Sequence, residues 1–204
     1  MKKLASSLLV LAVLGFAVLA ASAQALSSAD RESAVKYLEA TRKGVLDATA
    51  GLTEAQWNFK PAPDRWSVAE VAEHIAAAED FLFGLVTNQV MKAPAATTER
   101  NVKEIDAMVL AQIPDRTNKV QAPEPLRPTN RFGSSEGSLK HFQESRDRTI
   151  QFLQKTPDLR AHAIDSPLGK QLDAYEWVLF IAAHSERHTK QIREVMADLN
   201  FPKK

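Results

Sequence analysis

Histidine is the residue type whose spacing in this chain most clearly indicates chemistry. Two of the five histidines, His184 and His188, lie four positions apart in a segment with helical periodicity. Residues at i and i+4 share one face of a helix, about one turn apart, so both imidazoles can point at the same ion. Both residues fall on the apolar stripe of that segment, which predicts that they face the protein interior.

His74 is a candidate third ligand from a separate helical segment. Ala78 and Phe81 lie at same-face spacings from it, so its ring is also expected to point inward. Three neutral imidazoles on two helices could hold a divalent ion and leave a coordination position open to water or substrate. The alternative for His74 alone is a hydrogen-bonded core residue. His141 and His162 lie on no clear apolar stripe and are predicted to be surface or loop residues.

The composition excludes several other kinds of site. The 204 residues include no cysteine, which excludes disulfides, thiolate nucleophiles, iron–sulfur clusters and cysteine-ligated zinc. The 26 basic and 25 acidic residues give a net charge of +1, so no basic excess indicates nucleic-acid binding. A hydrophobic content of 45% is sufficient for one packed domain. The expected partner is therefore a small-molecule substrate or ligand and not a nucleic acid.

The N-terminal segment has the layout of a secretory signal peptide. Lys2 and Lys3 precede an apolar run from Leu8 to Ala20, and the small residues Ala21 to Ala23 provide a cleavage site. An exported protein without cysteine must obtain its stability from its core alone.

We predict that residues 1–23 are removed and that residues 24–204 form a single domain in the periplasm or outside the cell. After cleavage no attachment to the membrane is expected. The alternative is an uncleaved anchor, because the uncharged stretch from Leu4 to Leu26 is long enough to span a bilayer. Its serines and its small-residue end favour cleavage.

Four long segments have the periodicity of amphipathic helices. They cover residues 28–50, 67–91, 135–155 and 173–199. Helices of roughly 20 residues are about 30 Å long, which is the scale of a four-helix bundle. Strand signals are weak throughout, so the predicted fold is an all-α four-helix bundle.

Capping patterns and prolines mark the boundaries of these segments. Ser67 to Glu70 and Asp173 to Glu176 each place a capping side chain three residues before an acid. The proline-containing segment 52–65 is predicted to be a connection. Residues 92–133 are irregular, with a short amphipathic helix over 99–113 followed by four prolines. A connection this long is typical of a cover over a site or of a mobile segment.

A hydrolytic site also needs a proton acceptor near the attacking water. Glu73, Glu79 and Glu186 neighbour the histidines in the sequence, and all three are interpreted as solvated surface acids, so no general base is assigned. Gln191 could orient a ligand or a bound water, with an ordinary helix-surface role as the equal alternative. Two tryptophans are interpreted as core residues, with a pocket wall as the alternative: Trp66 and Trp177.

Several stretches of the chain resemble a known family. Lys60 to Ile75 looks like the entry to the second helix of DinB-like proteins. Ser166 to Gly169, followed by Tyr175 to Trp177 and His184 to Ile192, looks like the approach to their last helix and that helix itself. On these motifs the chain resembles the DinB/YfiT-like metal-binding superfamily over most of its length. The resemblance is weakest between residues 92 and 133.

The resemblance implies a DinB-like up-down-down-up bundle with an irregular connection between its second and third helices. It also implies a divalent metal, often zinc or nickel, whose ligands in this sequence are His74, His184 and His188. Many members have two adjacent histidines at the end of the second motif. Here Arg187 precedes His188, while the ligand spacing of four is kept. Arg187 is predicted to be exposed, with an anion partner as the alternative.

The family includes metal-dependent hydrolases without an established substrate and thiol-dependent S-transferases or isomerases. A divalent ion on three neutral histidines favours hydrolysis, because it can lower the pKa of bound water toward about 7. We therefore predict an exported, metal-dependent hydrolase. The alternatives are an S-transferase or isomerase of the same superfamily and a non-catalytic module that holds a metal or small ligand. The sequence is also compatible with a homodimer.

Overall fold

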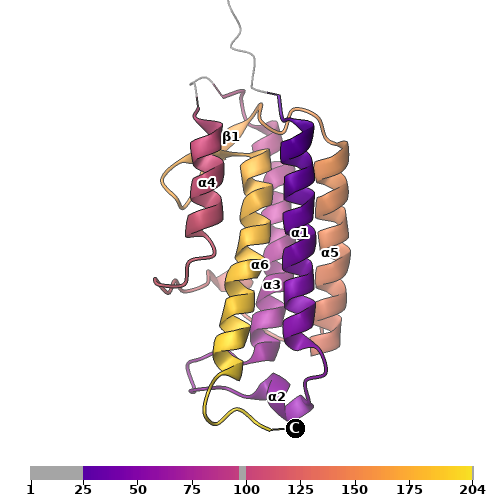
Figure 1. Cartoon of the computed structure of the whole chain (residues 1–204), viewed down its shortest axis with the longest axis vertical. Coiled ribbons are helices and arrows are strands. Elements are labelled where there is room, and N and C mark those ends of the chain that lie inside the picture. The colour runs from indigo at the N-terminus through magenta and orange to yellow at the C-terminus, as the bar shows by residue number, and fades with distance from the viewer. Residues whose placement is uncertain (1–24, 97–99, 204) are drawn as a thin grey trace, which may run out of the picture.

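The computed structural model describes residues 25–96 and 100–203. Its main feature is a bundle of four long helices (Figure 1). These helices are α1 (Ser28–Thr49), α3 (Val68–Asn88), α5 (Ser135–Lys155) and α6 (Ala174–Met196). The predicted all-α four-helix bundle is confirmed, and all four helices lie within about three residues of their predicted bounds.

The predicted signal peptide, residues 1–23, lies outside the described residues. Among the helices within the described ranges, none is both long enough and apolar enough to cross a membrane.

The four helices have up-down-down-up topology. In Figure 1, α1 and α6 run in one direction, and α3 and α5 run in the other. Two pairs of helices pack in parallel: α1 with α6, and α3 with α5. Two other pairs pack antiparallel: α3 with α6, and α1 with α5. A short turn cannot join two parallel helices, because the second begins at the opposite end of the bundle. Residues 89–96 and 100–134 lie in this return, which explains why the predicted irregular connection is long.

Smaller elements lie in the connections. Helix α4 (Val102–Gln112) packs against α6 and matches the short helix predicted over 99–113. Helix α2 (Glu54–Asn58) and a hairpin of β1 (Ala163–Asp165) and β2 (Gln171–Asp173) were not predicted. Helix α2 is shorter than two turns, and each strand has fewer than four residues. Segments this short show too little hydrophobic periodicity to be recognised in the sequence.

Local hydrogen bonds explain where the long helices begin. At the start of α3 the amide of Glu70 donates to the hydroxyl of Ser67 (3.2 Å), and the amide of Ser67 donates to the carboxylate of Glu70 (2.7 Å). This confirms the predicted capping box. The ends are less well predicted: α3 ends at Asn88 and α6 at Met196, and the 3-10 turn Val90–Lys92 occupies the last part of the predicted second helix.

The apolar core runs along the bundle axis in two clusters. The cluster nearer the hairpin includes Leu38, Leu82, Leu153 and Ile181. The cluster nearer α2 includes Val45, Ile75, Phe142 and Ile192. Burial of each such side chain contributes about 1.5–3 kcal/mol to folding.

A buried ion pair lies in the bundle interior. Arg146 of α5 is 0% exposed and donates to both carboxylate oxygens of Glu79 on α3, each at 2.8 Å. Its remaining donors reach the carbonyl of Leu38 and the hydroxyl of Thr41 on α1, and the hydroxyl of Ser185 on α6. The prediction that Glu79 is a solvated surface acid is wrong, because it neutralises a guanidinium that has no access to water. One side chain thus connects all four long helices.

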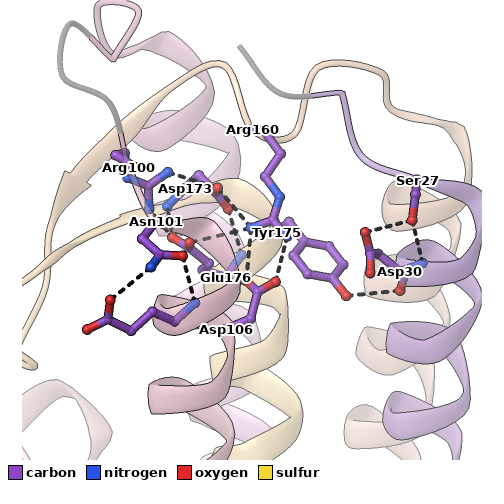
Figure 2. A network of polar contacts seen from close by, with 10 residues as sticks. Ser27, Asp30, Arg100, Asn101, Asp106, Arg160, Asp173, Tyr175 and Glu176 are labelled. Carbon is purple, nitrogen blue, oxygen red and sulfur yellow. Dashed lines mark hydrogen bonds and ion pairs between the residues drawn. The ribbon is translucent and has the colours of Figure 1, made fainter.

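A second ionic group closes the end of the bundle where α6 begins (Figure 2). We call it the cap cluster, and it consists of Arg100, Asp106, Arg160, Asp173, Tyr175 and Glu176. Arg160 donates to Asp106 (2.7 Å) and Asp173 (3.1 Å). Arg100 donates to Asp173 (2.9 Å) and also pairs with Glu176. The cluster therefore ties α4, which carries Asp106, to the first turn of α6.

Candidate metal centre

Three histidine side chains converge between α3 and α6. His74 comes from α3, and His184 and His188 come from α6. The Nε2 atom of His188 lies 3.2 Å from Nε2 of His74 and 3.1 Å from Nε2 of His184. His74 and His188 are buried and His184 is half-buried. The structure thus brings together the three residues that helical periodicity places on inward faces, and we call them the histidine cluster.

Hydrogen bonds on the far side of two rings determine which nitrogen faces the cluster. The Nδ1 atom of His74 lies 2.8 Å from the carbonyl oxygen of Leu126, which can only accept, so Nδ1 carries the proton. The Nδ1 atom of His188 lies 2.8 Å from Oε1 of Gln191 and likewise donates. In a neutral imidazole the other nitrogen is then an acceptor. The Nε2 atoms of both rings therefore present lone pairs to each other.

Facing lone pairs repel unless a cation lies between them. Burial away from water lowers the pKa of His74 and lowers the pKa values of His184 and His188 further, so all three are neutral at neutral pH, and no imidazolium proton lies between His74 and His188. An ion about 2.0–2.1 Å from each nitrogen holds its ligand nitrogens roughly 2.9–3.4 Å apart. The observed distances of 3.1 and 3.2 Å fall in that range. The residues present fit a divalent metal ion.

Aromatic rings border the histidine cluster. The ring centroid of Trp66 lies 4.9 Å from that of His74, and the ring of Phe180 stacks on that of His184 at 6.5 Å. Trp177 packs 5.2 Å from Phe180 and is buried in the apolar core, as predicted. Trp66 both packs against the core and borders the cluster. These rings limit access of water to the imidazoles, which strengthens electrostatic interactions there.

Glu73 supports the histidine cluster from behind. Its carboxylate accepts hydrogen bonds from the backbone amides of Thr129 (2.8 Å), Asn130 (2.8 Å) and Arg131 (3.0 Å). Burial raises the pKa of this carboxyl, but the hydrogen bonds outweigh that effect and the pKa ends below its usual value. The prediction that Glu73 is a solvated surface acid is wrong, because a returning loop covers it. The same loop carries the Leu126 carbonyl that orients His74.

Other residues considered from the sequence lie away from the histidine cluster. Glu186 is half-exposed and accepts a hydrogen bond from the hydroxyl of Tyr37 on α1 (2.6 Å). His141 is half-exposed on α5 and contacts Asp80 at 2.5 Å. His162 precedes β1 and is not among the three histidines that converge. None of the three acids near the histidines in sequence is hydrogen-bonded to a ring of the cluster within the described residues.

Two neighbours of His188 have roles that the sequence left open or assigned differently. Gln191 orients a histidine of the cluster rather than lying free on the helix surface. Arg187 was predicted to be exposed, but it is half-buried and donates to the carbonyls of Ile113 (3.3 Å) and Asn118 (2.6 Å). It thereby holds the segment that follows α4 against α6.

Sequence reasoning missed two further contributors, Leu126 and Arg116. Leu126 acts through its backbone carbonyl, which no residue type reveals. Arg116 contacts Gln191 from 75 positions away, and only the tertiary fold brings the two together.

Two surface hollows lie elsewhere on the bundle. One of about 310 Å³ is lined by residues of α1, α4 and α6, including Tyr37, Leu110 and Glu186. The other, of about 320 Å³, lies along α1 and includes Arg31 and Val35. No histidine of the cluster lines either hollow, so neither is the space beside the candidate metal centre.

The fold and the histidine cluster define the class of protein: a four-helix bundle with a three-histidine site between two antiparallel helices. The family model of the DinB superfamily matches residues 37–192, and the chain belongs to that superfamily. The resemblance seen in the sequence motifs is thereby confirmed.

Two individual proteins are similar to this chain. The uncharacterized protein YuaE of Bacillus subtilis (strain 168) is 27% identical over 147 residues, which are 71% of this chain and 86% of YuaE. The solved structure of YfiT from Bacillus subtilis matches with a TM-score of 0.55 at 16% identity, over 88% of this chain and 93% of YfiT. YfiT is described as a probable metal-dependent hydrolase with an unusual four-helix bundle topology. At this identity the similarity to YfiT establishes the shared fold.

Proposed function

We propose that this protein binds one divalent metal ion through His74, His184 and His188 and hydrolyses a small-molecule substrate there. The observation that carries the proposal is the convergence of three Nε2 atoms, separated by 3.1 and 3.2 Å, in neutral, mostly buried rings, with the lone pairs of His74 and His188 facing each other. Zinc or nickel is the proposed metal, because imidazole nitrogen suits both ions. The description of YfiT as a probable metal-dependent hydrolase supports the same reaction class.

The surroundings favour chemistry that does not depend on a carboxylate base. Three neutral ligands would leave a bound divalent ion its full charge, and such an ion would lower the pKa of water at an open coordination position toward about 7 and polarise a substrate carbonyl. Glu73 and Glu79 are occupied by loop amides and by Arg146, respectively. The protein's own contribution is to keep the three rings neutral, to orient His74 and His188, and to exclude water with Trp66 and Phe180.

The same occupied acids favour one alternative, a non-catalytic module that holds a metal or a metal-bound small ligand. The two functions differ in whether the metal-loaded protein turns over a substrate. A screen of esters, amides and lactones distinguishes them: hydrolysis that depends on added metal supports the enzyme, and its absence at full metal occupancy supports the binding module.

Metal content is the first measurement. The protein is purified without a tag or a chelating column, and its metals are quantified by elemental analysis. We expect about one metal ion per chain, lost in His188→Ala and retained in the matched control His141→Ala, whose half-exposed ring lies outside the cluster. Equal metal content in wild type and His188→Ala would overturn the proposed site.

We also propose export, on the signal-peptide layout of residues 1–23. The test is the intact mass of the protein recovered after expression of the full chain in a bacterium. A mass that corresponds to residues 24–204 in the periplasmic fraction supports export with cleavage. A full-length mass in the membrane fraction would indicate an uncleaved anchor instead.

A further inference from the structure

The side chain of Gln191 is ambiguous as a partner for His188. A glutamine amide carries an acceptor oxygen and a donor nitrogen of nearly equal size, and either can face an imidazole. If the oxygen faces Nδ1 of His188, Nδ1 carries the proton and Nε2 keeps a lone pair for a metal. If the nitrogen faces it, Nδ1 must accept, the proton moves to Nε2, and that tautomer cannot bind a metal through Nε2. Some other group must therefore select the amide orientation.

Arg116 provides that selection. Its Nη1 atom lies 3.3 Å from Oε1 of Gln191, the same oxygen that lies 2.8 Å from Nδ1 of His188. A guanidinium has only donors, so a rotated amide would place its own NH₂ group against another donor. With Arg116 present, the amide oxygen is the one atom of Gln191 that satisfies both neighbours.

The guanidinium of Arg116 is itself held in place from α6. Its Nε and Nη2 atoms donate to the two carboxylate oxygens of Glu194 at 2.7 and 2.8 Å, and the side chain is 12% exposed. A bidentate pair of this kind fixes the plane of the guanidinium as well as its position. Arg187 also holds this segment against α6, through the carbonyls of Ile113 and Asn118 on either side of Arg116.

We propose that Arg116 is a positioning residue that acts through Gln191 to keep His188 in the tautomer with a free Nε2 lone pair. The inference deepens the proposed function and rests on it, because the tautomer of His188 serves a function only where a metal binds its Nε2 atom. The tautomer itself is a property of the metal-free protein. It can therefore be measured whether or not the protein binds metal.

The test is nitrogen NMR of the His188 ring in metal-free protein at pH 8, where all three rings are neutral. We expect the Nδ1-protonated form in wild type and a mixture of both tautomers in Arg116→Met. Arg193→Met is the matched control, since it removes an exposed arginine of α6 that, among the described residues, makes no hydrogen bond to Gln191 or to the segment that carries Arg116. Its tautomer should equal that of wild type. A wild-type tautomer in Arg116→Met, or an equal change in Arg193→Met, would overturn the inference.

A rescue variant separates this role from a general structural one. In Arg116→Met/Gln191→Glu the amide becomes a carboxylate, which can only accept, so the Nδ1-protonated form should return without Arg116. Zinc affinity, measured by competition with a chelator, should fall about 10- to 100-fold in Arg116→Met and recover in the double variant. Failure of the double variant to restore the tautomer would refute the inference. If wild type shows the expected tautomers but binds no metal, the proposed function fails and the positioning role of Arg116 stands.

Discussion

The histidine cluster and the cap cluster lie on the same helix, yet their polar groups are arranged in opposite ways. In the cap cluster at the start of α6, every carboxylate contacts an arginine, as Asp173 does with Arg100 and Arg160. In the histidine cluster two turns further along, the acceptor Nε2 atoms of His74 and His188 face each other at 3.2 Å. We call the paired charges of the cap cluster matched, and they serve the fold, although Nε of Arg100 is buried without a hydrogen-bond partner among the described residues. A group of unmatched acceptors is complete only with a ligand.

The largest expected effect tests the matched groups. Arg146→Met leaves the carboxylate of Glu79 buried without its partner, so the free energy of unfolding should fall by about 3–5 kcal/mol, measured by urea denaturation. Arg42→Met, which breaks the partly exposed pair with Asp147, should cost no more than about 1 kcal/mol. The double variant Arg146→Met/Glu79→Leu should regain most of the loss. Equal costs for the buried and the exposed pair would contradict the structural role assigned to Arg146.

The second effect tests the unmatched group. A ligand that binds only the folded state at a hundred times its Kd adds about 2.7 kcal/mol to the free energy of unfolding. We expect zinc to produce such a rise in wild type and none in His184→Ala, measured by thermal denaturation at several zinc concentrations. Arg100→Met, altered in the cap cluster, should be less stable but should respond to zinc as wild type does. A zinc response in His184→Ala equal to that of wild type, or its loss in Arg100→Met, would remove the distinction between the two clusters.

A smaller effect is expected at Glu73, whose hydrogen-bonded carboxylate supports the histidine cluster. Glu73→Gln replaces one acceptor oxygen by an NH₂ group that faces a backbone amide of the loop 129–131, which should cost about 1–3 kcal/mol. The displaced loop should also weaken the orientation of His74 and so lower zinc affinity. Glu54→Gln, an exposed position on α2, is the control for both measurements. Unchanged stability in Glu73→Gln would show that the loop is held by other contacts.

The smallest effect is a difference in pH dependence. Burial and the charge of Asp173 raise the pKa of Glu176 to about 7. Between pH 4.5 and 7 the folded protein therefore keeps a proton that the unfolded chain has released, and this lowers the free energy of unfolding as pH rises through that window. The slope cannot exceed about 1.4 kcal/mol per pH unit for one group.

Glu176→Gln should remove this contribution, so the variant should gain stability relative to wild type between pH 5 and 7 and keep a constant difference above that. The histidine cluster has the opposite sign, because its lowered pKa values make the metal-free protein less stable in acid. Urea denaturation of metal-free wild type and variant across this range measures both effects. Parallel pH profiles would show that Glu176 titrates normally.

Much of the fold and the three histidines could be predicted because their signals are local. His184 and His188 are one turn apart, and Ser67 with Glu70 marks a helix start within four residues. Periodicity alone then places His74 on an inward face. The prolines predict where the connection between α3 and α5 lies in the sequence, but they do not predict its course along the bundle.

The errors concern polar residues whose partners are distant in the sequence. Glu79 looks like a surface acid until Arg146, 67 positions away, is packed against it. Glu73 is likewise covered by amides more than 50 positions away. A charged residue type indicates exposure on average, and only the tertiary fold shows which charges are matched in the interior. The short hairpin before α6 was missed for the separate reason that three-residue strands carry too little pattern.

The separation of the histidines along the chain also bears on how the protein withstands unfolding. His74 and His188 are 114 positions apart, while His184 and His188 are neighbours on one helix. A metal ion held by all three would join the first half of the chain to its last helix. Closing a loop of about 100 residues with a covalent crosslink restricts the unfolded chain by up to about 4.7 kcal/mol. In a chain without cysteine, coordination across this span would act as a reversible crosslink, which is present while the ion is bound and lost when the ion dissociates.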